Sequence, residues 1–159
     1  MVISNRAKRP NMPKDYCPFC PGSGKVPDDY QVYKYDNDFP ALSRPPAEMN
    51  HPLSGNAQGP YKVAPAYGKC EVILFSPDHH GKLYELAPDH MKKLVDLWQQ
   101  RYVELSSDEK IKYVFIFENR GEAVGVTQPH PHGQIYGYPF LPKKIEIELA
   151  NAVEYFDER

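Results

Sequence analysis

Two histidines, His130 and His132, stand one residue apart in the segment TQPHPHGQIYGYPF, residues 127–140. In an extended chain, residues i and i+2 face the same side, about 6 to 7 Å apart, and Pro131 biases His130 toward that geometry. Two imidazoles held this close could bind a metal ion, supply a nucleophile with its support, or form a hydrogen-bonded structural pair. Because Pro131 lacks a backbone donor, we expect the following strand to lie at a sheet edge or to open at this residue.

Cys17 and Cys20 form the motif CPFC, whose spacing lets both thiolates reach one tetrahedral ion. A redox dithiol has the same spacing but favours a helix N-terminus, whereas this sequence continues into a loop rich in proline and glycine. Two buried thiols are the remaining alternative. Cys70 lies in an apolar run and is expected to be a small buried residue. Two histidines would complete the ligand set, one from each of the pairs His79 or His80 and His130 or His132.

A closed Cys₂His₂ site would fix the backbone that aims the second imidazole of the pair at a substrate. Upstream, Gly121 and Gly125 let backbone N–H groups approach an anion. Thr127 and Gln134 flank the histidines and offer neutral donors to a phosphate oxygen. These residues predict a phosphate site centred on a histidine, with a structural histidine pair as the alternative.

The composition sets the class of protein. The chain has 159 residues, enough for one domain, with 41% hydrophobic and 13% aromatic residues, which indicates a globular protein. Its net charge of −2 argues against nucleic-acid binding. No apolar run is long enough to span a membrane, and the first ten residues lack a signal-peptide core. The odd number of cysteines argues against a disulfide framework, so we expect a cytoplasmic location.

Four stretches have the pattern of β-strands, because they are rich in β-branched and aromatic residues and end at turn-forming residues. They cover residues 30–37, 69–77, 112–119 and 133–140. Proline is enriched, at 17 residues in the chain. Several prolines fall in residues 43–66, which we expect to form a long loop within the domain.

A helix is predicted from Pro88, which suits the first helical position, to about residue 106. The spacing of its apolar residues predicts one buried face. That face comprises Met91, Leu94, Val95, Trp98, Tyr102 and Leu105. A second helix is predicted over residues 143–156. Since strands and helices do not alternate regularly, we expect an α+β fold with an antiparallel sheet.

Residues 117–142, FENRGEAVGVTQPHPHGQIYGYPFLP, resemble the active-site segment of the galactose-1-phosphate uridylyltransferase family, a branch of the histidine-triad superfamily. Further motifs occur in the family's order: NRAKRP (5–10), CPFC (17–20), NDFPAL (37–42) and FSPDH (75–79). The resemblance covers nearly the whole chain. It implies one domain over residues 1–159, built as a histidine-triad-like antiparallel β-sheet with flanking helices.

The resemblance also implies roles for individual residues. It assigns one structural zinc ion to Cys17, Cys20, His79 and His130. It makes His132 the nucleophile and Gln134 its transition-state partner. The remaining matches are substrate-binding positions. Asn37, Asp38 and Val72 would line a uridine pocket, and Thr127 would lie near the transferred phosphate. Asn119 would be a further substrate-binding residue. Arg6 and Arg9 would approach the phosphates from the partner subunit of a homodimer. Without the resemblance, the segment RAKR would indicate a solvated basic tail.

The implied reaction moves UMP from UDP-glucose to galactose 1-phosphate through a covalent uridylyl-histidine intermediate. The leaving group is already a stable phosphate anion and hardly needs a general acid. This accounts for Gln134 at the position where the motif His-x-His-x-His has its third histidine.

Family members have a second, similar half, whereas this chain stops inside a helix at EYFDER, so it is expected to be an N-terminal fragment or a natural half-length relative. Only Glu148 of a second metal site would be present. Three alternatives remain: a nucleotidyltransferase like ADP-glucose phosphorylase, a non-catalytic nucleotide-binding module held together by zinc, and a purely structural zinc domain.

Overall fold

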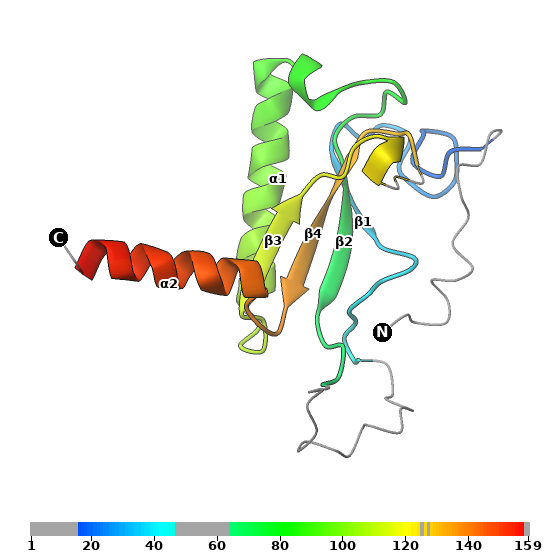
Figure 1. Ribbon diagram of the computed structural model, residues 1–159. Helices are drawn as coiled ribbons and strands as arrows, with labels where there is room; N and C mark the ends of the chain where they lie inside the picture. Colours follow the sequence, from blue (N-terminus) through cyan, green and yellow to red (C-terminus); the bar gives the residue numbers. More distant parts are fainter. Residues whose placement is uncertain (1–15, 47–63, 125, 127, 158–159) are drawn as a thin grey trace.

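The computed structural model describes residues 16–46, 64–124, 126 and 128–157. Within these residues, four strands form one antiparallel sheet in the order β1-β2-β4-β3. The strands are β1 (Tyr33–Asp36), β2 (Lys69–Leu74), β3 (Tyr113–Phe117) and β4 (His132–Tyr138). The helices are α1 (Pro88–Ser106) and α2 (Lys143–Asp157), with the short 3₁₀ segments η2 (Leu83–Glu85) and η3 (Glu122–Val124). The predicted α+β class with an antiparallel sheet is confirmed (Figure 1).

Each predicted strand is present, but its ends differ from the prediction. β1 begins three residues late because Tyr30 turns inward and donates a hydrogen bond to the carbonyl of Phe19, 2.7 Å away. β2 ends at Leu74, before the turn that carries the metal-binding candidates. β4 starts directly after Pro131 and lies between β2 and β3. The expectation of an edge strand is therefore wrong, and the alternative, a strand that opens at the proline, is what the structure shows.

Helix α1 has the predicted bounds, with Pro88 in its first turn. Leu94 and Leu105 are buried in the core, as expected, but Val95 and Tyr102 are 47% and 50% exposed. Arg101 is buried instead, because it stands seven residues after Leu94 and four before Leu105 and so lies on the same face. Its guanidinium donates from Nε and Nη2 to the carboxylate of Glu71 at 2.8 and 2.7 Å.

The sheet has a separate core on each face, because successive side chains of a strand point to opposite sides. One core lies under α1 and contains Ile73, Phe75, Leu94, Leu105, Ile111, Val114 and Ile135. The other is formed where residues 16–30 pack on the sheet, and it contains Phe19, Val26, Tyr30, Val72 and Leu74. Cys70 is 2% exposed, so its predicted burial is confirmed.

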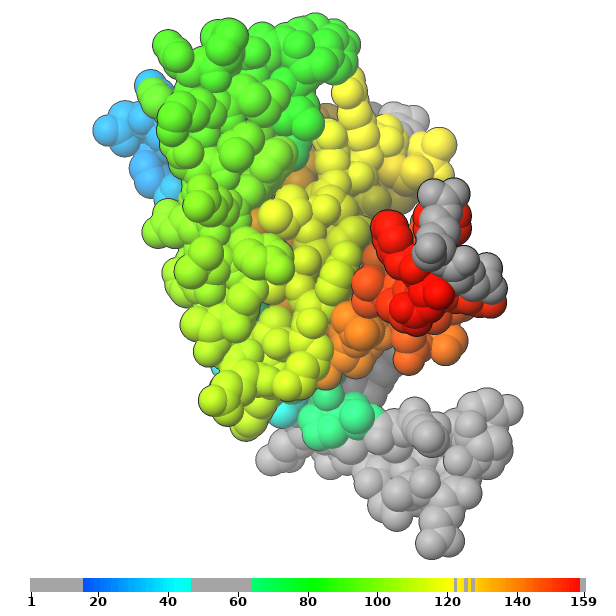
Figure 2. All heavy atoms as spheres, turned by 90° about the vertical axis from the view of Figure 1, so that its left-hand side faces the viewer, coloured from blue at the N-terminus to red at the C-terminus, as the bar shows by residue number. Residues whose placement is uncertain are grey.

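Helix α2 projects away from the sheet and has no buried residue (Figure 1). Figure 2 shows α1 and β3 side by side, with α2 extending outward beside them. Of the two α-helices in the described residues, α1 is therefore the one that packs against the sheet. Neither helix is apolar over enough length to cross a bilayer within the described residues. The ends of the 43–66 segment meet, since Ser43 N donates to Ala66 O at 3.1 Å, while its residues 47–63 lie outside the described chain.

Candidate active site and metal centre

The antiparallel topology brings four chain segments to one end of the sheet. β2 and β3 finish at this end, and β1 and β4 start there. The residues that precede β1, follow β2 and precede β4 are consequently neighbours. These segments carry the CPFC motif, His79 and His130, although up to 113 residues separate them in the sequence.

Cys17, Cys20, His79 and His130 form one cluster, in which the four ligand atoms all lie within 4.8 Å of one another. Cys20 Sγ lies 3.3 Å from His79 Nδ1 and 3.6 Å from His130 Nδ1, and Cys17 Sγ lies 3.7 Å from His130 Nδ1. Zinc–sulfur bonds of about 2.3 Å and zinc–nitrogen bonds of about 2.0 Å give tetrahedral edges of about 3.4 to 3.8 Å. The donor set therefore fits a single tetrahedral ion.

The hydrogen bonds of His130 leave the correct nitrogen for a metal. Its Nε2 lies 2.8 Å from the carbonyl oxygen of Ser76, which can only accept, so Nε2 carries the proton. The lone pair is then on Nδ1, the atom that faces both thiols. Burial lowers the pKa of His130, which favours the neutral ring that a metal needs. Tyr30 Oη lies 3.0 Å from the same Nε2.

The two thiols do not have the properties of a redox dithiol. Burial, together with the neighbouring Cys17 thiol, raises the pKa of Cys20 to about 11. Reactive dithiols instead have a lowered thiol pKa, and they favour a helix N-terminus. Cys17 and Cys20 lie in a turn, and neither forms a disulfide. A divalent cation would offset the charge of two thiolates here and displace their protons.

His132 does not belong to the cluster, and its own hydrogen bond fixes its tautomer. Its Nδ1 lies 2.7 Å from the carbonyl oxygen of His130, so Nδ1 is the protonated nitrogen and the lone pair is on Nε2. The ring centroid lies 5.5 Å from that of Phe19. The backbone carbonyl of His130, a candidate metal ligand, thus holds the imidazole of His132.

Gln134 follows on the same face of β4, and its Oε1 accepts a hydrogen bond from Tyr136 Oη at 2.9 Å. Directly across the strand pair lies Val72, which is buried. Gly133 has no side chain between His132 and Gln134, and a Cβ there would lie 2.8 Å from Phe75 Cζ. The absence of that side chain lets β4 lie close to the core.

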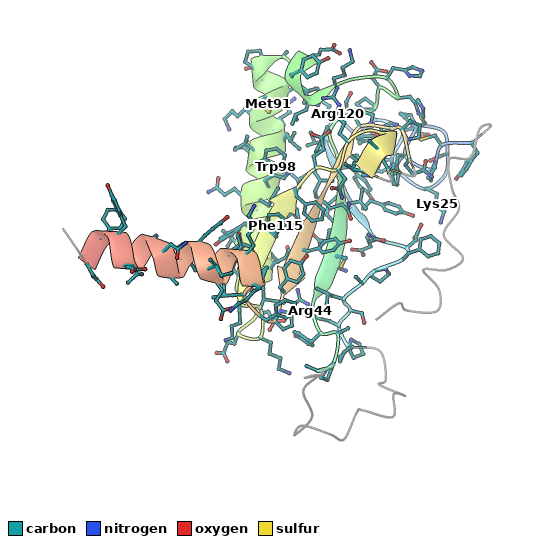
Figure 3. All side chains as sticks on the ribbon, viewed as in Figure 1. Lys25, Arg44, Met91, Trp98, Phe115 and Arg120 are labelled. Atoms are coloured by element: carbon teal, nitrogen blue, oxygen red, sulfur yellow. The ribbon has the colours of Figure 1, made fainter. Side chains whose placement is uncertain are left out.

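His132 opens into a pocket of about 290 Å³ at this end of the sheet. Asn119 lines the same pocket, as do two cations, Lys82 and Arg120. Lys82 Nζ and Arg120 Cζ lie 5.4 and 5.2 Å from the ring centre of Tyr84. Arg120 follows β3 at the end of the sheet where the loops gather (Figure 3). The lining of the pocket therefore carries two cations and one carboxylate, Glu118, and Lys82 Nζ also pairs with Glu85 Oε1 at 2.8 Å. Cations in the lining can bind phosphate oxygens.

The structure does not bring all predicted substrate residues to this pocket. Asn37 follows β1 at the opposite end of the sheet, where its Oδ1 accepts from Phe39 N at 2.9 Å, and it lines a separate pocket of about 360 Å³. Asp38 accepts from Tyr35 Oη at 2.8 Å. Arg6, Arg9 and Thr127 lie outside the described residues.

The remaining histidine and carboxylate predictions are also placed. His80 is not a member of the cluster. Glu148 is exposed on α2, with its Oε1 3.7 Å from Lys144 Nζ. The described residues contain one group with metal-binding geometry, so they give Glu148 no partner ligands.

Sequence reasoning missed four residues that support or line the site. Tyr30 was assigned to a strand, and no sequence signal indicated that its hydroxyl would reach His130. Strand alternation does place Tyr136 on the face of Gln134, so its contact could have been anticipated. Lys82 and Arg120 carry charge but belong to no motif, and only the fold brings them into the lining of the pocket that His132 shares.

Comparisons with known proteins identify the family. The model of the galactose-1-phosphate uridyl transferase N-terminal domain matches residues 3–142. A galactose-1-phosphate uridylyltransferase of Thermotoga maritima is 39% identical over 160 residues, which covers 100% of this chain and 49% of that protein. One of Streptomyces lividans is 36% identical over 148 residues, which covers 91% of this chain and 36% of that protein.

Solved structures show the same fold. A uridylyltransferase structure superposes with a TM-score of 0.82 at 27% identity, covering 100% of this chain and 48% of that one. An ADP-glucose phosphorylase from Arabidopsis thaliana with bound ADP-glucose has a TM-score of 0.76 at 25% identity, covering 97% of this chain and 50% of that one. The chain spans at most about half the length of these relatives. It belongs to the galactose-1-phosphate uridylyltransferase family, whose N-terminal domain it matches.

Proposed function

We propose that this chain carries the nucleotidyl-transfer site of an enzyme that moves UMP from UDP-glucose to galactose 1-phosphate, with His132 as the nucleophile. The observation that carries the proposal is the hydrogen bond between His132 Nδ1 and the carbonyl oxygen of His130. It leaves the lone pair on Nε2, as a neutral imidazole nucleophile requires. Family membership supports the choice of reaction.

In the first step, His132 Nε2 attacks the α-phosphorus of UDP-glucose. A P–N bond forms, and the P–O bond to the β-phosphate breaks, so that glucose 1-phosphate leaves with the electron pair. In the second step, a phosphate oxygen of galactose 1-phosphate attacks the same phosphorus, and the P–N bond breaks to regenerate His132. Gln134 stabilises charge on the transferred phosphate through its amide, which acts as a donor and not as an acid.

We propose zinc as the ion of the Cys17, Cys20, His79 and His130 cluster, because two thiolates and two imidazoles in a tetrahedral arrangement suit it. With four protein ligands the site has no open position, so the ion would be structural and would stabilise the turn that aims His132. Metal analysis of the purified chain would distinguish zinc from iron.

The remaining contacts of the proposal concern the substrates and the partner subunit. We propose that Val72, Asn37 and Asp38 contact the uridine, and that Asn119 and Thr127 contact the phosphates. Asn119 is supported by its place in the pocket of His132. Arg6 and Arg9 would reach the phosphates of the partner subunit in a homodimer, which analytical ultracentrifugation would test. We propose a cytoplasmic location, supported by three cysteines without a disulfide.

A second candidate is a phosphorylase that takes ADP-glucose, with inorganic phosphate as the acceptor. It is favoured by the similarity to the Arabidopsis ADP-glucose phosphorylase, whose fold this chain shares over 97% of its length. The same His132 would form an adenylyl instead of a uridylyl adduct.

The test is the intact mass of the metal-loaded chain after incubation with UDP-glucose, beside an ADP-glucose sample. We expect a uridylyl adduct on the wild type and on His80→Ala, since His80 is a neighbouring histidine outside the cluster. His132→Ala should form no adduct while it retains its metal. An adenylyl adduct would favour the phosphorylase. The absence of any adduct from the folded, metal-loaded chain would contradict catalysis by this chain alone and would leave the binding module or the structural zinc domain.

A further inference from the structure

Tyr136 shares a face of β4 with the two residues of the proposed reaction. Gly133, Ile135 and Gly137 are buried on the α1 side of this strand, so the intervening side chains point to the other side. Tyr136 stands two residues beyond Gln134, farther from the end of the sheet where His132 lies. Its hydroxyl is within hydrogen-bond distance of Gln134, so it is placed to act on that side chain.

The hydroxyl of Tyr136 donates to Gln134 Oε1 at 2.9 Å. A glutamine amide has one accepting end and one donating end, and an amide without fixed partners can present either. The hydrogen bond holds the accepting end toward Tyr136, so the NH₂ group is the end left to face elsewhere. Oxygens of an anionic phosphate only accept hydrogen bonds, and they need this NH₂ group. The opposite orientation would set the amide oxygen against the phosphate oxygens.

Aromatic packing holds the phenol in place. The ring of Tyr136 makes an edge contact with Phe117 at 5.1 Å between centroids and 81° between planes, and its centroid lies 5.9 Å from that of Tyr138. Such contacts restrict the ring and therefore the position of its hydroxyl. The donor to Gln134 is thus in place before any substrate binds, which is the condition for preorganised catalysis.

We infer that Tyr136 is a positioning residue for nucleotidyl transfer, and that its hydroxyl orients the amide of Gln134 so that the NH₂ group faces the phosphate transferred to His132. The inference rests on the proposed function. It adds a hydroxyl outside the His-x-His-x-Gln motif to the machinery of the reaction.

The kinetic test measures the rate of adduct formation on His132 at saturating UDP-glucose by rapid quench and intact mass. Tyr136→Phe should slow this rate by about 3- to 10-fold, the worth of one neutral hydrogen bond, with little change in UDP-glucose affinity. In a Gln134→Ala background the same substitution should have no further effect. Tyr138→Phe is the matched control, a tyrosine on the same strand and face, and should leave the rate unchanged. An unaffected rate in Tyr136→Phe, or equal slowing in both backgrounds, would overturn the inference.

A second measurement does not depend on catalysis. The side-chain NH₂ signals of Gln134 in a ¹H–¹⁵N spectrum are assigned by their loss in Gln134→Ala. They should shift in Tyr136→Phe and stay in place in Tyr138→Phe. A selective shift supports the positioning contact even if the wild-type chain forms no adduct, a result that would contradict only the proposed function. Signals that do not move in Tyr136→Phe would refute the contact itself.

Discussion

Replacing Arg101 with methionine should strongly destabilise the fold, because it leaves the carboxylate of Glu71 without its partner. Glu71 is fully buried, and Arg101 donates to both of its oxygens. Methionine keeps most of the apolar stem of Arg101, which lies on the buried face of α1 together with Leu94 and Leu105. The main loss is therefore the compensation of a buried charge, which costs about 3 to 5 kcal/mol when one partner of such a pair is removed.

A second route to the magnitude is protonation of the orphaned carboxyl group. A carboxyl group with the ordinary glutamate pKa of about 4.3 needs about 3.7 kcal/mol to be protonated at pH 7, at about 1.36 kcal/mol per pH unit. This free energy is an upper limit to the cost of the unpaired charge. If burying the charged carboxylate costs more than protonating it, the carboxyl group takes up a proton instead. The two routes agree on a loss of about 3 to 4 kcal/mol.

The loss should come from the unpaired charge of Glu71 and not from a change in side-chain volume. A double variant, Glu71→Gln with Arg101→Met, removes the charge and should recover at least half of the loss at pH 7.

The assay is urea unfolding followed by the fluorescence of Trp98, which is the one tryptophan in the sequence and packs against Phe75 at 6.2 Å. With an m-value of about 2 kcal/mol per M urea, the midpoint should fall by about 1.5 to 2 M. Lys92→Met is the control: it breaks an exposed ion pair with Asp96 and should change stability by less than about 0.5 kcal/mol. A loss below about 1 kcal/mol, or a double variant that recovers none of the loss, would refute the reasoning.

Three further predictions concern the cluster and the acid stability. Cys20→Ser should reduce the bound metal, measured by atomic absorption, from one ion per chain toward none. Cys70→Ala, at the buried thiol outside the cluster, should retain the metal. Equal metal content in both variants would exclude the cluster as the metal site. Tyr30→Phe should lower the free energy of unfolding in urea by about 1 to 3 kcal/mol, because its buried hydroxyl lies within hydrogen-bond distance of the carbonyl oxygens of Phe19 and Ser76. An unchanged free energy of unfolding would mean that other donors bind these carbonyl oxygens. A hydrogen bond from Lys69 lowers the pKa of Asp36, and one from Tyr67 lowers the pKa of Asp108. The stability that these two carboxylates contribute is therefore present above about pH 4 and is lost as the pH falls through their lowered pKa values. Asp108→Asn should reduce the slope of unfolding free energy against pH in this acid range, and an unchanged slope would count against the prediction.

Much of the fold could be predicted from local sequence. Helix α1 has the predicted bounds because a proline start and a 3.6-residue apolar period are both local signals. The strands were found for the same reason, but their ends were displaced by contacts that periodicity does not record. Tyr30, for example, continues the pattern of β1 yet bonds to the carbonyls of Phe19 and Ser76.

The assignment of polar residues to the core could not be predicted in this way. A helical wheel favoured Val95 and Tyr102 over Arg101 because it ranks side chains by hydrophobicity alone. Burial of Arg101 is favourable only because Glu71 on β2 supplies the opposite charge across the sheet–helix interface. That compensation depends on a contact between residues 30 positions apart.

By itself, the sequence determined the chemical inventory of the site: two thiols at metal-binding spacing, four candidate histidines, and an ordered set of motifs that indicated the family. Spacing alone left open which histidines join the thiols, since ligand choice depends on distances across the fold. The tertiary structure decided this by bringing the ends of β2 and β3 and the starts of β1 and β4 together, so that His79 and His130 meet the cysteines and His80 and His132 do not. It also decided the tautomers of His130 and His132, because each proton is fixed by a backbone carbonyl whose position only the folded chain defines.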